Sequence, residues 1–231
     1  MAPRSLLGRV YAGARMGRAS RLDALEPPMR LAYAAAWGAF RAGSVPVGAV
    51  LTDGDGAVVT TGRARQLDVD AVPGRLGNAS IAHAEIDALA RLPHGRHADH
   101  TMWATLEPCL LCTGALVIAS VGTVRFAAAD PLWAGLDRLP EINAFVATRW
   151  PRRFGPRADE LGAFAMLLPL LFYRQRYPDG ASITIHRTAA PRVAALADDL
   201  VDSEERRGWP SMELEDVLDR VWPRLAAAAH P

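Results

Sequence analysis

The sequence predicts an α/β fold, in which helices cover a sheet that contains parallel strand pairs. Two observations lead to this expectation. From residue 47 to residue 127, short apolar or β-branched runs alternate with segments of helical periodicity, which is typical of strands joined by crossover helices. The chain also has 231 residues, 50% of them hydrophobic, and this is enough to bury a core unaided.

The first expected elements are a helix and a β-hairpin. Pro27 and Pro28 suit the start of a helix, and its buried face is marked by apolar residues at helical spacing: Met29, Tyr33, Trp37 and Phe40. Residues 47–52 and 57–61 are β-branched runs that flank Asp-Gly-Asp-Gly at 53–56. Because glycine adopts positive φ at low steric cost, this spacing predicts two antiparallel strands joined by a tight turn.

The middle of the chain alternates helix and strand. Residues 66–80 contain two glycines and a proline and are expected to form a loop, whereas residues 82–92 have the periodicity of a helix. Residues 101–106 and 123–127 are apolar runs of strand length, separated by a helix that begins at Pro108. A helix between two strands predicts that the strands are parallel.

Beyond about residue 140 the pattern becomes helical, with helices expected at 158–175, 191–201 and 211–225. The stretch 161–173 is apolar throughout, but it has only 13 residues and contains Pro169. A membrane span needs roughly 20 apolar residues. We therefore expect a buried, kinked helix in a soluble, cytoplasmic protein that does not enter a membrane.

Charge and cysteine content exclude several classes of protein. The 26 basic and 25 acidic residues give a net charge of +1, which argues against a protein held to nucleic acid mainly by charge. Two cysteines are too few for a disulfide scaffold. Residues 1–24 include five arginines and are expected to form a basic, flexible arm.

Four residues carry the chemistry: His83, Glu85, Cys109 and Cys112. The two cysteines are three residues apart in the first turn of an expected helix, so both sulfurs lie on one side. Free backbone N–H groups and the helix dipole favour thiolates there. Two thiolates and one imidazole suit Zn²⁺ and leave a fourth position for water, which is the pattern of a catalytic zinc site.

Glu85 has a different expected role. His83 and Glu85 would point about 200° apart on a regular helix, so both reach one site only at a helix start. Zinc lowers the pKa of bound water to about 7, and a carboxylate beside that water accepts its proton and later delivers it to a substrate. Glu85 is therefore the expected proton shuttle.

Two alternative interpretations leave part of this pattern unexplained. A Cys-x-x-Cys pair alone is typical of thioredoxin-like redox sites, but the preceding His-Ala-Glu then has no role. A structural zinc site needs a fourth protein ligand, which one of three histidines would have to supply: His94, His97 or His100. These three are expected to be exposed loop residues instead.

Three segments resemble the tRNA adenosine deaminase and guanine deaminase branch of the cytidine deaminase-like superfamily. They are 46–51 (PVGAVL), 82–86 (AHAEI) and 105–115, which holds the Pro-Cys-x-x-Cys motif. The similarity covers roughly residues 29–130 and implies a three-layer α/β/α sandwich with a mixed five-stranded sheet. It also implies that His83, Cys109 and Cys112 hold one Zn²⁺ per chain, that Glu85 is catalytic and that the Ala84 backbone N–H contacts the base.

This resemblance sets the expected domain organisation. Residues 25–140 are expected to form the zinc deaminase domain, and residues 141–231 a mainly helical C-terminal extension packed on it. The family often forms dimers, so a homodimer is also expected.

The chain departs from the family pattern in its substrate contacts. Ala64 stands where the family usually has an asparagine that holds the base or sugar. Asn78, in the longer loop that follows, is a candidate replacement, and a turn-forming asparagine after Gly77 is the alternative. Asp137 is a candidate for the aspartate that assists proton transfer in guanine deaminases.

The function implied by the resemblance is hydrolytic deamination of a purine or pyrimidine base or nucleoside, with zinc-bound hydroxide as nucleophile and release of ammonia. A small substrate is expected in preference to RNA, because the net charge is near zero and the carboxyl-terminal third is acidic. Deamination of adenosine in tRNA is the first alternative. A catalytically inactive binding module that keeps zinc for folding is the second.

Overall fold

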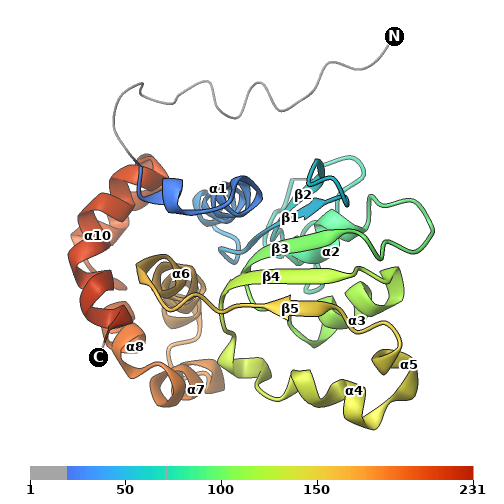
Figure 1. Ribbon diagram of the computed structural model, residues 1–231. Helices are drawn as coiled ribbons and strands as arrows, with labels where there is room; N and C mark the ends of the chain where they lie inside the picture. Colours follow the sequence, from blue (N-terminus) through green and yellow to red (C-terminus); the bar gives the residue numbers. More distant parts are fainter. Residues whose placement is uncertain (1–19, 71, 231) are drawn as a thin grey trace.

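The computed structural model describes residues 20–70 and 72–230. Its centre is a five-stranded sheet in the order β2-β1-β3-β4-β5 (Figure 1). The strands are β1 (Gly48–Thr52), β2 (Val58–Arg63), β3 (Thr101–Leu106), β4 (Thr123–Ala128) and β5 (Arg152–Phe154). β1 runs antiparallel to β2 and β3, whereas β3, β4 and β5 are parallel. The sheet is mixed, as predicted.

Helices cover both faces of the sheet. α1 (Pro27–Arg41) and α6 (Glu160–Arg176) pack on one face, and α2 (Ala84–Leu89) and α3 (Leu110–Ala119) lie on the other. Two glycines show how close the layers are: a Cβ on Gly48 would overlap the carbonyl oxygen of Ala32 in α1, and one on Gly62 that of Ala84 in α2. The predicted three-layer sandwich is confirmed.

The hairpin between β1 and β2 forms where the sequence predicts it. Asp53 fixes the turn, because its Oδ1 accepts hydrogen bonds from the backbone N–H groups of Asp55 and Ala57. Gly56 has a φ of 82°, a conformation that a residue with a side chain adopts only at a cost.

The carboxyl-terminal helices share the core of the sandwich (Figure 1). They are α7 (Ala181–Ala189), α8 (Pro191–Leu200), α9 (Glu204–Gly208) and α10 (Leu214–Ala229), and α8 and α10 pack against α6. Trp209, directly after α9, is fully buried, and its ring centroid lies 6.2 Å from that of Phe40 in α1. Nε1 of Trp37 donates to the carbonyl oxygen of Met212 at 3.2 Å.

The apolar stretch at 161–173 lies in α6, which is a core helix. α6 runs on through Pro169, which is buried with most of its neighbours. The hydroxyl of Tyr33 in α1 donates to the carbonyl oxygen of Leu161 at 2.7 Å. Within the described ranges, no helix is long and apolar enough to cross a membrane.

The structure differs from the predicted organisation at both ends of the sandwich. β5 follows two short helices, α4 (Leu139–Ile142) and α5 (Ala144–Ala147), so a boundary at residue 140 would separate the fifth strand from its sheet. Residues 21–24 of the predicted flexible arm form a 3-10 helix with Leu22 buried, and Arg21 stacks on Trp222 of α10. Apolar contact therefore orders this part of the arm. Residues 1–19 of the arm lie outside the described residues.

Candidate metal centre and active site

Two helices begin close together beyond the carboxyl end of β3. His83 is the residue before α2, and Cys109 is the residue before α3. Both have extended backbones, with ψ of 157° and 178°, so neither is part of the regular helix that follows it. Cys109 therefore precedes the first turn in which the sequence placed it, and Cys112 lies within that turn. His83 and Glu85 reach the same site because His83 precedes the helix, as predicted.

The imidazole and the two sulfurs form a compact cluster. Nδ1 of His83 lies 3.5 Å from Sγ of Cys109 and 3.5 Å from Sγ of Cys112. One donor atom from each residue lies within 4.8 Å of the others. Among residues 20–70 and 72–230, this is the only cluster of His, Cys, Asp or Glu side chains found with the spacing of a metal site.

The three histidines of the loop after α2 do not join this cluster. His97 was expected to be exposed, but it is 8% exposed. Its Nε2 lies 3.1 Å from the carbonyl oxygen of Pro93, and its ring packs on that of His100. Its backbone also bonds to Ala119 and Gly122. His97 therefore holds the loop against α3, and the cluster keeps three protein donors.

The two sulfurs are not electrostatically equivalent. A hydrogen bond from Cys112 lowers the pKa of Cys109 to about 4, even though burial acts in the opposite direction. The same hydrogen bond, together with burial, raises the pKa of Cys112. A hydrogen bond to Cys109 also raises the pKa of His83. Thiolate and imidazole donors at this spacing are the ligands that Zn²⁺ prefers, so the donor set fits zinc.

Glu85 lies beside the cluster without belonging to it. Its side chain is almost fully buried, and its Oε2 accepts a hydrogen bond from Sγ of Cys112 at 3.3 Å. Burial raises the pKa of Glu85, and the negative charge of Cys109 raises it further. A carboxyl group held in this way is suited to carry a proton at neutral pH.

Two residues outside the predicted motifs also lie near the cluster. Asp130 follows β4, is 6% exposed and accepts a hydrogen bond from the backbone N–H of Leu132. Burial and then the charges of Cys109 and Glu107 raise the pKa of Asp130 to about 7. Burial and then the charges of Asp130 and Cys109 raise the pKa of Tyr173, in α6, to about 12. Asp130 lies two residues after the end of β4 and belongs to none of the short motifs by which the sequence marks the site.

Glu107 holds Asp130 in place. Oε2 of Glu107 accepts from the backbone N–H of Asp130 at 3.2 Å, and Oε1 lies 2.6 Å from Nη2 of Arg153 in β5. The backbone N–H of Glu107 donates to the carbonyl oxygen of Ala128. The ends of β3, β4 and β5 are thus joined at the edge where the cluster lies.

The predicted substrate contacts lie in different surroundings. Ala84 is buried and is the first residue of α2, where a backbone N–H has no partner within its own helix. Asn78 is exposed with a φ of 47°, and its N–H donates to the carbonyl oxygen of Arg65, which is the conformation of a turn residue. Asp137 is exposed, so Asp130 is the acid that the structure brings near Cys109.

The arginines on either side of Ala64 take part in an ion-pair network. Asp87 of α2 is buried, and its Oδ2 lies 2.6 Å from Nη1 of Arg75 and 3.5 Å from Nε of Arg65. Arg63 and Arg65 both pair with Asp68, at 2.6 and 2.9 Å. These arginines secure the loop before α2 and are not free to replace the missing asparagine.

Comparison with known families gives a match that contains all four residues of the site. Residues 23–128 match the family described as "Cytidine and deoxycytidylate deaminase zinc-binding region". The match ends at the last residue of β4, so β5 and the helices after it lie outside the matched region.

Individual relatives extend this picture. A tRNA(Ile)-lysidine synthase of Deinococcus radiodurans is 33% identical over 190 residues, which cover 78% of this chain and 30% of that protein. A tRNA-specific adenosine deaminase of Bacillus subtilis is 36% identical over 93 residues, covering 38% of this chain and 52% of that protein. This chain thus spans about half the length, or less, of both. The solved guanine deaminase of Nitrosomonas europaea is 22% identical, with 63% of this chain and 82% of that one covered and a TM-score of 0.46.

Proposed function

We propose that this chain, whose residues 23–128 match the zinc-binding region of cytidine and deoxycytidylate deaminases, is a zinc-dependent hydrolase. Its reaction replaces the exocyclic amino group of a purine or pyrimidine base by a carbonyl oxygen. The observation that carries this proposal is the buried Glu85 carboxyl group, 3.3 Å from Cys112. A zinc site that serves only folding has no use for this acid, which speaks against an inactive binding module.

The residues that would hold the metal are His83, Cys109 and Cys112. A zinc ion bound by them would supply the Lewis acidity that makes a water molecule reactive near neutral pH. The starts of α2 and α3 face the site with their free N–H groups, which offset the negative charge of the thiolates.

Glu85 moves the protons of the reaction. It accepts a proton from the attacking water and passes it to the ring nitrogen next to the amine-bearing carbon. A second transfer through the same carboxyl group protonates the amino group, the C–N bond breaks and ammonia leaves. The raised pKa of Glu85 lets the side chain hold the proton between the two transfers.

The base needs contacts that keep its amine-bearing carbon over the site. We assign one of them to the backbone N–H of Ala84, which lies at the free end of α2. Asn78 and Asp137 stay predictions. Asp130 is buried near Cys109, and this makes it a better-placed acid than Asp137 for contact with the substrate.

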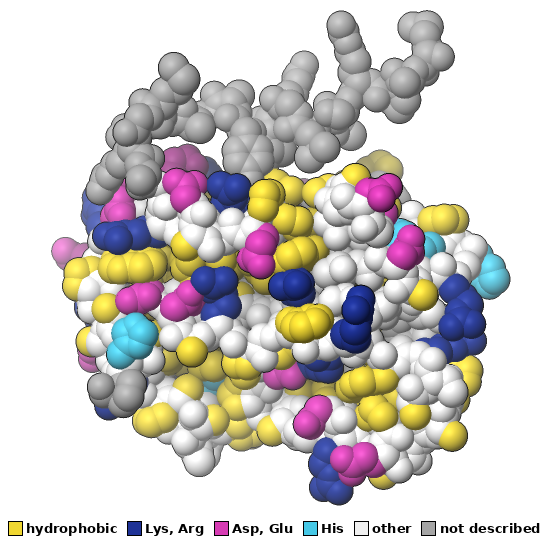
Figure 2. All heavy atoms as spheres, viewed as in Figure 1, with side chains coloured by type: hydrophobic (Ala, Val, Ile, Leu, Met, Phe, Trp, Pro, Cys, Tyr) yellow, Lys and Arg dark blue, Asp and Glu magenta, His cyan; other side chains and the backbone are white. Residues whose placement is uncertain are grey.

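A free base or small nucleoside is the first candidate substrate. The net charge is +1, and Figure 2 shows basic and acidic side chains interspersed over the visible face. A protein that binds RNA mainly through its phosphates usually presents a continuous basic surface instead.

Deamination of adenosine in tRNA is the second candidate, and the relatives favour it. The names of the Deinococcus and Bacillus proteins both refer to tRNA. The alignment with the first extends over 190 residues, which is too long to lie within residues 23–128, so part of the carboxyl-terminal region is also shared with a tRNA-acting protein.

An ammonia-release screen distinguishes these candidates. The zinc-loaded protein is incubated with free bases, nucleosides, nucleotides and a tRNA anticodon stem-loop, with Glu85→Gln as the inactive control. Ammonia from at least one substrate class, absent with the control, is the expected result. No release from any class would contradict the proposed function.

The metal assignment is tested separately by elemental analysis. We expect about one zinc per chain, because one tetrahedral site is available. The double variant Cys109→Ser/Cys112→Ser should lose the metal, whereas Ser120→Ala, a buried change in α3's carboxyl-terminal turn, should keep it. Full zinc occupancy in the double variant would contradict the ligand assignment.

We also propose a cytoplasmic homodimer. Two buried, unpaired cysteines suit a reducing compartment. Along α3, the apolar side chains of Leu110, Leu111 and Ile118 are exposed, as is typical of surfaces that a partner covers. Light scattering of the purified protein measures the oligomeric state.

A further inference from the structure

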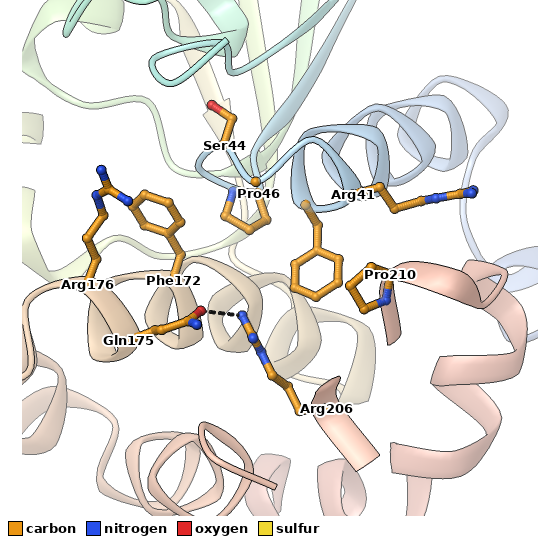
Figure 3. A pocket seen from close by; sticks show the side chains of 10 residues that line it. Arg41, Ser44, Pro46, Phe172, Gln175, Arg176, Arg206 and Pro210 are labelled. Atoms are coloured by element: carbon orange, nitrogen blue, oxygen red, sulfur yellow. Dashed lines mark hydrogen bonds between the residues drawn. The ribbon is translucent and has the colours of Figure 1, made fainter. Parts of the chain in front are cut away.

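A pocket lies outside the zinc site, between the carboxyl ends of α1 and α6 and the helix α9 (Figure 3). It has a volume of about 560 Å³. Its lining includes Gln175, three arginines and two aromatic rings. These are Arg41, Arg176, Arg206, Phe40 and Phe172. The pocket therefore combines positive charge with flat apolar surfaces.

The charge of this pocket is not balanced by its lining. No acidic residue is among the described residues that line it. Arg41 lies 3.9 Å from Glu213, whose side chain is 74% exposed, and such a pair contributes little in water. Arg176 is exposed and forms no ion pair within the described residues. The described lining thus carries three arginines and no acidic side chain.

Arg206 is the most constrained of the three arginines. Its Nη2 donates to Oε1 of Gln175 at 2.8 Å, as Figure 3 shows, and its guanidinium lies over the ring of Phe40 at 5.5 Å. Its Nε is buried and has no hydrogen-bond partner in the part of the chain that the structure describes, and burial lowers the pKa of Arg206. A buried donor without a partner costs free energy, so an anion in the pocket would be favoured.

The pocket lies at the same end of the sheet as the zinc site. Phe172 lines the pocket, and the next residue, Tyr173, is close enough to Cys109 and Asp130 for their charges to raise its pKa. On the other wall, Pro46 precedes β1, and the N–H of Gly48 donates to Oγ1 of Thr105 near the end of β3. A ligand that occupied both the zinc site and this pocket would therefore lie along this edge of the sheet.

We propose that this pocket binds the phosphate group of a nucleotide, carried either by a mononucleotide substrate or by the backbone of RNA. Guanidinium groups form paired, charge-assisted hydrogen bonds with phosphate oxygens, and the faces of Phe40 and Phe172 suit a neighbouring sugar or base. The volume is typical of pockets that hold small ligands. This inference rests on the proposed function and makes it more specific, because it favours phosphate-bearing substrates over free bases.

Calorimetric titration of the full-length, zinc-loaded Glu85→Gln protein tests the proposal without turnover. The probes are the 5′-monophosphates of adenosine, guanosine and cytidine, the three nucleosides, and an RNA stem-loop. At least one monophosphate, or the stem-loop, should bind about tenfold or more tightly than the nucleosides, and the difference should fall as salt is added.

Charge-removing variants locate the binding to the pocket. Arg176 is exposed and has no ion pair with any residue in the ranges 20–70 and 72–230. Arg176→Gln should therefore fold normally and weaken phosphate binding about tenfold, and Arg206→Gln should have the same effect. The matched control is Arg207→Gln, because Arg207 is adjacent but bonds to the backbone of Asp202 and does not line the pocket. If the variants bind mononucleotides more weakly, the pocket holds the phosphate of a mononucleotide substrate. If only binding of the stem-loop becomes weaker, the pocket holds a phosphate of the RNA backbone.

Two results would overturn the inference. One is equal binding of nucleosides and phosphates, with the stem-loop no tighter. The other is an equal loss of binding in Arg176→Gln and Arg207→Gln. If the screen releases ammonia, either result leaves the deaminase proposal unaffected. Phosphate binding without any ammonia release would contradict the deaminase proposal and leave the phosphate pocket unaffected.

Discussion

Two buried carboxyl groups, those of Glu85 and Asp130, lie near the same sulfur atom of Cys109, and the negative charge of that sulfur adds to burial in raising the pKa of both. The sequence predicted the first from its position two residues after His83. It gave no basis for the second, because the approach of Asp130 depends on how β4 ends and on the bond from its N–H to Glu107. A short sequence motif identifies site residues that are close together in the chain. Site residues that only the folded structure brings together cannot be identified in this way.

At the residue scale, the first prediction concerns Glu85→Gln. The amide keeps the shape of the side chain but cannot exchange protons, so kcat should fall at least about 10²- to 10⁴-fold while zinc content stays the same. Steady-state ammonia release and elemental analysis measure the two effects. An unchanged kcat would show that another group moves the protons.

The second prediction concerns the pH dependence of stability. The pKa of Asp130 is about 7 in the folded chain, against about 3.9 in an unfolded one, so the folded state binds the extra proton between these values. The contribution of Asp130 to the free energy of unfolding is therefore greatest at low pH. It falls as pH rises toward 7, by at most about 1.4 kcal/mol per pH unit.

Asp130→Asn should remove this dependence, because the amide keeps the acceptor for Leu132 but does not ionise. The free energy of unfolding of the variant minus that of the wild type, from urea titrations between pH 5 and 8, should rise with pH and level off above 7. A difference independent of pH would contradict the raised pKa.

At the scale of elements, the sequence predicted those that local chemistry determines. The hairpin turn was recognisable because Asp53 and the glycines after it act within four residues. The strand β5 was not, since Arg152–Phe154 lacks an apolar run and is held by pairing with β4. The helix α7 contains Ile183, Thr184 and Ile185, which favour strands, and the burial of Ile183 and His186 overrides that preference.

The third prediction tests the contact between β2 and α2. A Cβ at Gly62 would overlap the backbone of Ala84, next to His83, so Gly62→Ala should destabilise the fold by about 1–3 kcal/mol and weaken zinc retention. Gly114→Ala is the matched control, because no atom of the described residues outside the adjoining backbone of α3 and the two chain neighbours lies within 4 Å of its Cβ position, and alanine favours helix α3. Urea unfolding and zinc release to a chelator measure both effects. Equal stability of the two variants would contradict the close packing.

At the scale of the whole molecule, the carboxyl-terminal helices are part of the same core as the sheet. The sequence predicted their amphipathic faces but placed a boundary at residue 140, because a strand of three residues gives no detectable pattern. That boundary removes β5 and α6 from the sandwich, although α6 packs on both β3 and β4.

The fourth prediction is that the fragment ending at residue 140 aggregates. It would expose the side of the core that α6 covers with large buried side chains: Leu161, Phe164, Leu167, Leu168, Leu170 and Leu171. Each is worth about 1.5–3 kcal/mol on burial, and a domain is stable by only about 5–15 kcal/mol in total. Soluble yield and size-exclusion chromatography, with the full chain in parallel, measure the effect. A soluble, monodisperse fragment that retains zinc would contradict it.

His83 and Cys109 each stand immediately before a helix and are 26 positions apart along the chain. A metal ion bound by both would act as a cross-link, closing a loop that contains α2 and β3. By the loop-entropy relation used for disulfides, closing such a loop lowers the conformational entropy of the denatured chain. This loss of entropy corresponds to a free energy of about 3–4 kcal/mol. The site would then influence how the chain folds as well as what it catalyses: a newly made chain that captures zinc early would search far fewer arrangements of its central segment.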